Sequence, residues 1–143
     1  DLVEEINWRH QQPGWKPIIY LREHISPAAL LAYHRIAHFC VVSSLHDGMN
    51  LVAKEYVSAR SDGDGVLILS RFTGAARELT DALLINPWAI DEFARTIKDA
   101  VEMPPQERQR RMSKMREVVQ QNNIYCWAAD ILSEMVKFEI GVA

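Results

Sequence analysis

Residues 44–56 read SLHDGMNLVAKEY, and the expected fold of the chain is organised around this segment. An apolar run at 39–42 precedes it, and apolar residues at helical spacing follow its Asp-Gly turn. This pattern predicts a strand, a tight polar turn and the beginning of a helix. In a parallel α/β sheet such a turn lies beyond the carboxyl end of a strand, which is where ligands bind.

The beginning of the predicted helix suits a phosphate group, because its N–H groups are unpaired and it carries the positive end of the helix macrodipole. Glu55 follows Asn50 by five positions, which is about one and a half helical turns. From there its carboxylate can reach sugar hydroxyls beside a bound phosphate. The turn alone fits an ordinary strand–helix connection equally well, because Asp-Gly occurs wherever a positive φ is needed.

Apolar runs alternate with helical patterns along the chain, which predicts βαβ units and a parallel sheet. We expect a Rossmann-like three-layer α/β/α fold with at most four strands. The expected strands are residues 17–21, 39–43, 66–70 and 82–85. The expected helices are residues 1–12, 26–37, 50–59, 91–103, 104–120 and a last one from residue 124. Residues 1–143 are expected to be one partial domain, because the chain opens inside a helical pattern with Asp1 rather than Met.

The composition is that of an ordinary globular protein, with a formal net charge of −3. This charge gives no reason to expect nucleic acid or an anionic membrane as a partner. No apolar run approaches the ~20 residues of a membrane-spanning helix, and no secretory signal opens the sequence. Cys40 and Cys126 are expected to be buried free thiols in a reducing cytoplasm.

Two strings carry a close resemblance to a known family. They are DGMNLVAKEY at 47–56 and GVLILSRFTGAARELTDALLINPW at 65–88. Both resemble the C-terminal nucleotide-sugar domain of the trehalose-6-phosphate synthase family, whose members are retaining glycosyltransferases with the GT-B fold. The resemblance extends from about Ile6 to the region of Trp127. It implies that the chain is part of that C-terminal domain, with the preceding strands and the N-terminal Rossmann domain absent.

The resemblance implies a role for each residue of the central turn. Asp47 matches the catalytic-site carboxylate that accepts hydrogen bonds from hydroxyls of the donor glucose. Gly48 lets the backbone approach the sugar closely. The N–H groups that hold the glucose and the diphosphate match Met49, Asn50, Leu51 and Val52. The side chains of Leu51 and Val52 fit a core role equally well.

Two further positions complete the implied binding site for UDP-glucose. Glu55 matches the carboxylate that binds the ribose hydroxyls. Ile25 falls where the main chain meets the base; the family often has an aromatic residue there, so only the main-chain contact is carried over.

The resemblance implies transfer of glucose from UDP-glucose to glucose 6-phosphate, which gives trehalose 6-phosphate and UDP. It implies retention by front-face attack, without a covalent intermediate, a metal or another cofactor. The family places an arginine and a lysine that neutralise the diphosphate on an upstream loop, so the fragment alone is expected to be inactive. A homo-oligomer is left open.

Three other functions remain open at this point. One is a transferase of the same fold with another acceptor, such as a glucosylglycerol-phosphate synthase. Another is a non-catalytic, synthase-like regulatory domain, which an intact Asp47 and Glu55 disfavour. The third is nucleic-acid binding through the basic helix at 107–116, which the net charge disfavours.

Other candidate residues have simpler interpretations. His34 and His38 stand four positions apart on one predicted helix, which suits a metal, but no third ligand is placed by the sequence. The basic helix at 107–116 is expected to have a solvated face. Trp127 and Phe138 on the last helix are expected to be core residues.

Overall fold

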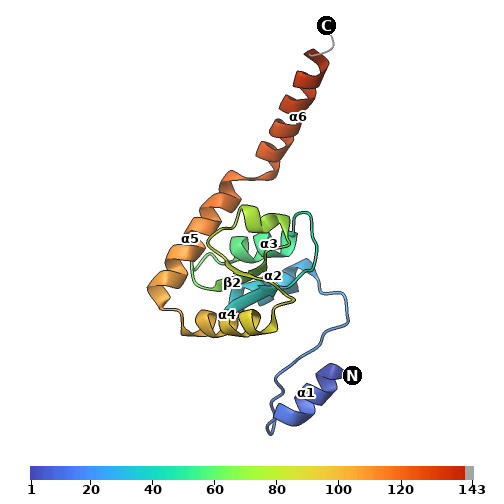
Figure 1. The fold of residues 1–143 in the computed structure, drawn as a ribbon, viewed down its shortest axis with the longest axis vertical. Coiled ribbons are helices and arrows are strands. Elements are labelled where there is room, and N and C mark those ends of the chain that lie inside the picture. Colours follow the sequence, from blue (N-terminus) through green and yellow to red (C-terminus); the bar gives the residue numbers. More distant parts are fainter. Residues whose placement is uncertain (141–143) are drawn as a thin grey trace.

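The computed structural model describes residues 1–140, together with the side chains of residues 1–137. Figure 1 shows a small sheet with helices on both of its faces, a first helix that stands apart at the end of an extended segment, and a last helix that projects away from the body. The described helices are α1 (Leu2–His10), α2 (Pro27–Ile36), α3 (Leu51–Ala59), α4 (Ile90–Glu102), α5 (Pro105–Gln121), α6 (Ile124–Ile140) and the short 3₁₀ helix η1 (Gly74–Arg77). The described strands are β1 (Phe39–Val42), β2 (Val66–Ser70) and β3 (Leu83–Ile85).

The sheet is parallel, and its strand order is β1-β2-β3. Phe39 pairs in register with Val66, and Ile68 pairs with Leu83. Every residue of β2 is buried, as is typical of a parallel strand covered on both faces.

Side chains of β2 alternate between two clusters, because successive residues of a strand point to opposite faces. Leu67 and Leu69 join a cluster with residues of α3 and α5, whereas Val66 and Ile68 join a cluster with residues of α4. The first cluster includes Tyr56, Val57, Met112 and Met115; the second includes Ile85, Ala100 and Met103. The expected three-layer α/β/α arrangement is therefore confirmed.

The predicted strand at 17–21 is wrong. Ile19 and Tyr20 are exposed, and among the described residues the segment pairs with no strand. It is held instead by the amide side chain of Asn7, which donates to Ile18 O and accepts from Ile18 N, both at 2.9 Å. An apolar run becomes a strand only where a neighbouring strand satisfies its backbone groups.

Helical spacing predicts an apolar face of α2 formed by Leu30, Leu31, Tyr33, Ile36 and Ala37, and this prediction is wrong for three of the five residues. Its buried residue is His34, whereas Leu31, Tyr33 and Ile36 are exposed. The ring of His34 lies edge-on to the ring of Tyr56 at a centroid distance of 6.0 Å, so an aromatic contact decides which side of the helix faces inward.

The last helix departs from its expectation as well. Trp127 is 53% exposed and Cys126 is exposed, so neither is the core residue that the sequence predicted. The side chain of Phe138 lies outside the described residues.

Cys40 is a half-buried free thiol, and burial raises its pKa to about 11. Over the described part of the chain, no helix has both the length and the apolar character that a membrane crossing needs.

Candidate functional site

Asp47 and Asn50 organise the turn between β1 and α3. The Asp47 carboxylate accepts hydrogen bonds from the Met49 amide at 3.0 Å and from the Asn50 side chain at 2.9 Å. These bonds, the one from Met49 first, hold the pKa of Asp47 below its ordinary value. Asn50 has a positive φ of 73° and caps α3, where its side-chain oxygen accepts from Ala53 N at 2.9 Å. The turn is therefore preorganised and carries an ionised carboxylate.

A second loop lies directly against this turn at the carboxyl edge of the sheet. Gly74 N donates to Asp47 O at 2.9 Å, and Ala75 N donates to Met49 O at 2.7 Å. A Cβ at Gly74 would lie 2.0 Å from Gly48 O, so the two loops approach too closely for any larger residue. The loops that follow β1 and β2 thus form one rigid rim.

Two amides at the beginning of α3 remain available. Within residues 1–140, no group accepts a hydrogen bond from the backbone N–H of Leu51 or of Val52. Their side chains are 60% and 45% exposed, which excludes the core role that the sequence had left open. Since the positive end of the macrodipole lies at the same point, this helix start favours an anion.

A cleft of about 410 Å³ opens at the rim. Its lining residues come from the two loops and from η1: Leu45, His46, Asp47, Gly48, Arg71, Phe72, Thr73, Gly74 and Arg77. Arg71 forms an ion pair with Glu92 of α4, while Arg77 is exposed. Sequence reasoning did not single out these two arginines, although their place after β2, at the same sheet edge as the central turn, was a usable signal.

A groove of about 460 Å³ lies between α2 and α3. Its walls are Pro27, Leu30, Leu31, His34 and Arg35 from α2, and Leu51, Lys54, Glu55, Ser58 and Ala59 from α3. Glu55 is exposed, whereas the ammonium group of Lys54 is paired with Glu78 at 2.9 Å. The carboxylate that is free to meet a ligand in this groove is therefore that of Glu55.

The predicted site residues thus divide between two hollows. Asp47 and Gly48 line the cleft, and Leu51 and Glu55 line the groove. Residues 49–50 connect the two along the chain. Ile25 is half-buried just before the cap of α2, and it is not among the lining residues of either hollow.

Two other candidates lose their functional interpretation. His34 is buried and His38 is exposed, and among residues 1–140 no cluster of three or more His, Cys, Asp or Glu side chains could hold a metal ion. The sequence predicted that the basic face of α5 is solvated, and the structure shows that part of this face is bound to the rest of the domain. Arg108 binds the carboxylate of Asp64 at 2.7 Å, and Arg116 donates to Ser58 O at 2.9 Å, so this face fastens α5 to the domain.

Comparison with known proteins shows which family the chain belongs to. Residues 1–137 match the family model of glycosyltransferase family 20. The chain belongs to this family. Its sequence is 44% identical over 131 residues to a trehalose-6-phosphate synthase of Enterobacter sp. (strain 638), which covers 91% of the chain and 28% of the relative. A glucosylglycerol-phosphate synthase of Picosynechococcus sp. is 42% identical over 133 residues, which covers 93% of the chain and 27% of that relative.

Solved structures of family 20 members share the fold. The E. coli trehalose-6-phosphate synthase bound with UDP-2-fluoro glucose superposes with a TM-score of 0.88 at 41% identity, over 92% of this chain and 30% of that chain. The resemblance predicted from residues 47–56 and 65–88 is therefore confirmed, and so is the GT-B type of fold. The chain spans 28% and 27% of the length of the two curated relatives named above.

Proposed function

We propose that the chain is the donor-binding part of a retaining glycosyltransferase. The complete enzyme would transfer glucose from UDP-glucose to glucose 6-phosphate and release trehalose 6-phosphate and UDP. A second Rossmann-like domain would supply the acceptor side, and both would work in the cytoplasm. The observation that carries the proposal is the pair of unengaged amides at Leu51 and Val52, at the helix start where the chain passes from the cleft that contains Asp47 to the groove that contains Leu51 and Glu55.

The amides of Leu51 and Val52 would hold the diphosphate. Negative charge develops on this group as the bond to the sugar breaks, and donors that are already in place stabilise that charge without reorganising. Their first-turn position adds the favourable end of the helix macrodipole. The proposal therefore needs no metal at the diphosphate, and EDTA should leave donor binding unchanged.

Asp47 would hold the glucose in the cleft. Its two carboxylate oxygens each already accept one hydrogen bond, from Met49 and from Asn50. A carboxylate has about four acceptor positions, so it can still receive hydrogen bonds from sugar hydroxyls. The lowered pKa of Asp47 keeps it an acceptor at neutral pH. Since this carboxylate is fixed by the turn, we assign it to binding and orientation of the sugar rather than to attack on it.

Glu55 would hold the nucleoside in the groove between α2 and α3. It is the exposed carboxylate on the α3 wall, about one helical turn beyond the amides that would hold the diphosphate. The ribose is attached to the diphosphate, so its hydroxyls can donate hydrogen bonds to the Glu55 carboxylate while the diphosphate lies at the start of α3. The main chain at Ile25, next to the start of the α2 wall, would meet the base.

Calorimetry with UDP-glucose tests this proposal. We expect weak binding to residues 1–143, which is lost in Asp47→Ala and in Glu55→Ala. Asp130→Ala, on the exposed surface of α6, is the matched control and should bind as the unmodified chain does. Equal affinity in all four proteins would contradict the proposal.

Glycerol phosphate remains a candidate acceptor because of the similarity to a glucosylglycerol-phosphate synthase. The glucosylglycerol-phosphate synthase is nearly as similar to the chain as the Enterobacter relative, 42% against 44% identity. An assay of the full-length protein with glucose 6-phosphate and with glycerol phosphate decides between the two. We expect turnover with glucose 6-phosphate; turnover with glycerol phosphate alone would favour the other enzyme.

A further inference from the structure

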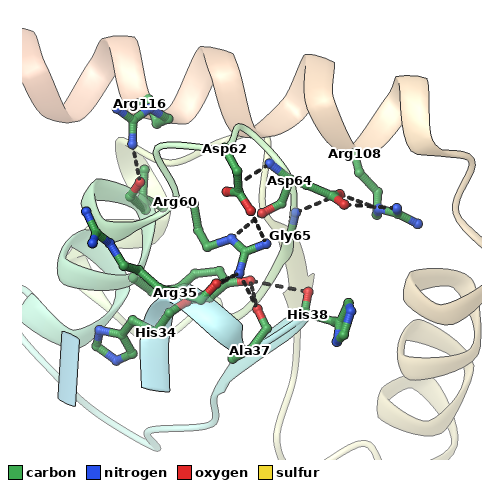
Figure 2. Close-up of polar contacts among 12 residues, drawn as sticks. His34, Arg35, Ala37, His38, Arg60, Asp62, Asp64, Gly65, Arg108 and Arg116 are labelled. Carbon is green, nitrogen blue, oxygen red and sulfur yellow. Dashed lines mark hydrogen bonds and ion pairs between the residues drawn. The ribbon is translucent and has the colours of Figure 1, made fainter. Parts of the chain in front are cut away.

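A buried arginine stands where α3 ends. Arg60 is the C-cap residue of α3, and its side chain is only 5% exposed. Figure 2 shows its guanidinium at the centre of a network that joins α2, α3 and the loop before β2. A buried guanidinium needs several acceptors to offset its lost hydration, so its partners indicate what it holds together.

Most of the guanidinium partners lie at the end of α2. Arg60 Nη1 donates to Ala37 O at 3.0 Å, to His34 O at 3.5 Å and to Arg35 O. The last carbonyls of a helix have no partner within the helix, and they carry the negative end of its macrodipole. Arg60 therefore satisfies the end of α2 with both hydrogen bonds and charge.

The rest of the guanidinium is fastened to the loop at 61–65. Arg60 Nη2 pairs with the Asp62 carboxylate at 2.8 Å, and Arg60 Nε donates to Asp64 O. The Asp64 carboxylate in turn receives two hydrogen bonds from Arg108 of α5, at 2.7 and 3.2 Å. Arg60 is thus fixed from the α5 side as well as from α3 (Figure 2).

Apolar burial on α2 is limited to the half-buried Leu30 and to Ala37 at its C-cap, which packs against the larger core cluster. Among the described side chains of this helix, His34 is the buried one, whereas Leu31, Tyr33 and Ile36 are exposed. Tyr56 adds one more polar contact at the same end, because its hydroxyl lies 3.2 Å from Ala37 O and 3.3 Å from His38 O. The position of α2 against α3 therefore depends on a few directional hydrogen bonds, most of them from Arg60.

We infer that Arg60 is a positioning residue for the nucleoside part of the donor. It holds the α2 wall of the groove at a fixed distance from the α3 wall, which carries Glu55. This inference rests on the proposed function, since the groove is taken to hold the nucleoside. Arg60 itself is not among the groove's lining residues, so it acts through α2.

The inference predicts different effects of an Arg60 substitution on the affinity for two ligands. UDP would fill both the groove and the amide site at the start of α3, whereas inorganic pyrophosphate would occupy the amide site alone. Arg60→Met keeps most of the side-chain volume and removes every donor. We expect UDP affinity to fall about tenfold in this variant, since hydrogen bonds to charged groups are the strong ones. Pyrophosphate affinity should not change.

Hydrogen exchange measured without a ligand tests the hold on α2 directly. In Arg60→Met we expect exchange across 30–37 to accelerate by about tenfold, while exchange in α5 and β2 stays as it is. Arg60→Lys, which restores a charge and donors at the end of α2, should recover part of both losses. Arg111→Met is the matched control, because Arg111 is half-buried on α5 and binds Glu107 and Asp81 O rather than α2.

Each result has a distinct meaning. Equal losses of UDP and pyrophosphate affinity, or unchanged exchange in α2, would overturn the inference. If Arg60→Met does not fold, Tyr56→Phe removes the neighbouring hydrogen bonds and should shift the ratio of UDP affinity to pyrophosphate affinity in the same direction by a smaller factor. An unchanged ratio would overturn the inference.

If the unmodified chain binds pyrophosphate but not UDP, the proposed function fails and the nucleoside role of Arg60 fails with it. The exchange data would still show whether Arg60 holds α2.

Discussion

Two helices flank α3, and they differ in how much apolar packing holds them. α5 inserts Met112 and Met115 into the larger core cluster, where both are almost completely buried. α2 buries a single side chain, that of His34, and is fastened by the hydrogen bonds of Arg60 and Tyr56. Apolar burial is non-directional, whereas hydrogen bonds fix direction and distance. The helix that lines the candidate site is therefore the one whose position polar groups control.

The largest expected effect lies on the α5 side. Met112→Ala removes a fully buried side chain from the larger core cluster. We expect it to lower the free energy of unfolding by about 2–5 kcal/mol, because it loses transfer free energy and leaves a cavity. Urea denaturation followed by circular dichroism measures this loss. A loss as small as that of an exposed residue would mean that α5 is not the packed helix described above.

A smaller effect on stability is expected from acid. It acts on the loop at 61–65, which both Arg60 and Arg108 contact. Hydrogen bonds from Arg108 lower the pKa of Asp64 below its ordinary value of 3.8. A carboxyl whose pKa is lower in the folded state stabilises the fold above its ordinary pKa, and this contribution is lost as the pH falls through the lowered value. Asp64→Asn should therefore reduce stability at neutral pH and flatten its decline below pH 3.8. Urea denaturation across this pH range measures the stability of the unmodified chain and of Asp64→Asn. Parallel declines in the stability of the two proteins would contradict a stabilising role of the Arg108–Asp64 ion pair.

The smallest effect is expected on the outer face of α2. Tyr33 is about half exposed, and among the described residues its side chain is not a partner of Arg60. Tyr33→Ala should change the free energy of unfolding by no more than about 0.5 kcal/mol. A loss comparable to that of Met112→Ala would show that α2 is held by apolar packing, and the contrast between the two helices would disappear.

The sheet and the turn after β1 could be predicted because their signals are local. Apolar runs bounded by turn residues marked 39–43, 66–70 and 82–85, and the Asp-Gly turn marked the beginning of α3. The run at 17–21 has the same local pattern and is not a strand. Pairing depends on a neighbour, which composition does not reveal.

The candidate site could be predicted only where its residues follow one another in the chain. Asp47, Gly48 and Glu55 stand at fixed offsets from one helix start, so their roles could be proposed in advance. The α2 wall, with its buried His34, depends on how two helices pack. Arg60 sits between a helix end and a polar loop, where a charged residue would ordinarily be solvated, and nothing local indicates that it is buried.

The central claim is that the free amides of Leu51 and Val52 bind the diphosphate of UDP-glucose. A titration of the ¹⁵N-labelled chain with UDP-glucose, followed by NMR, tests it residue by residue. We predict the largest amide shifts at Leu51 and Val52, with smaller ones at Met49 and Ala53, whose amides already donate to Asp47 and Asn50. Saturable shifts that leave Leu51 and Val52 unmoved, or no shifts at any concentration, would contradict the claim.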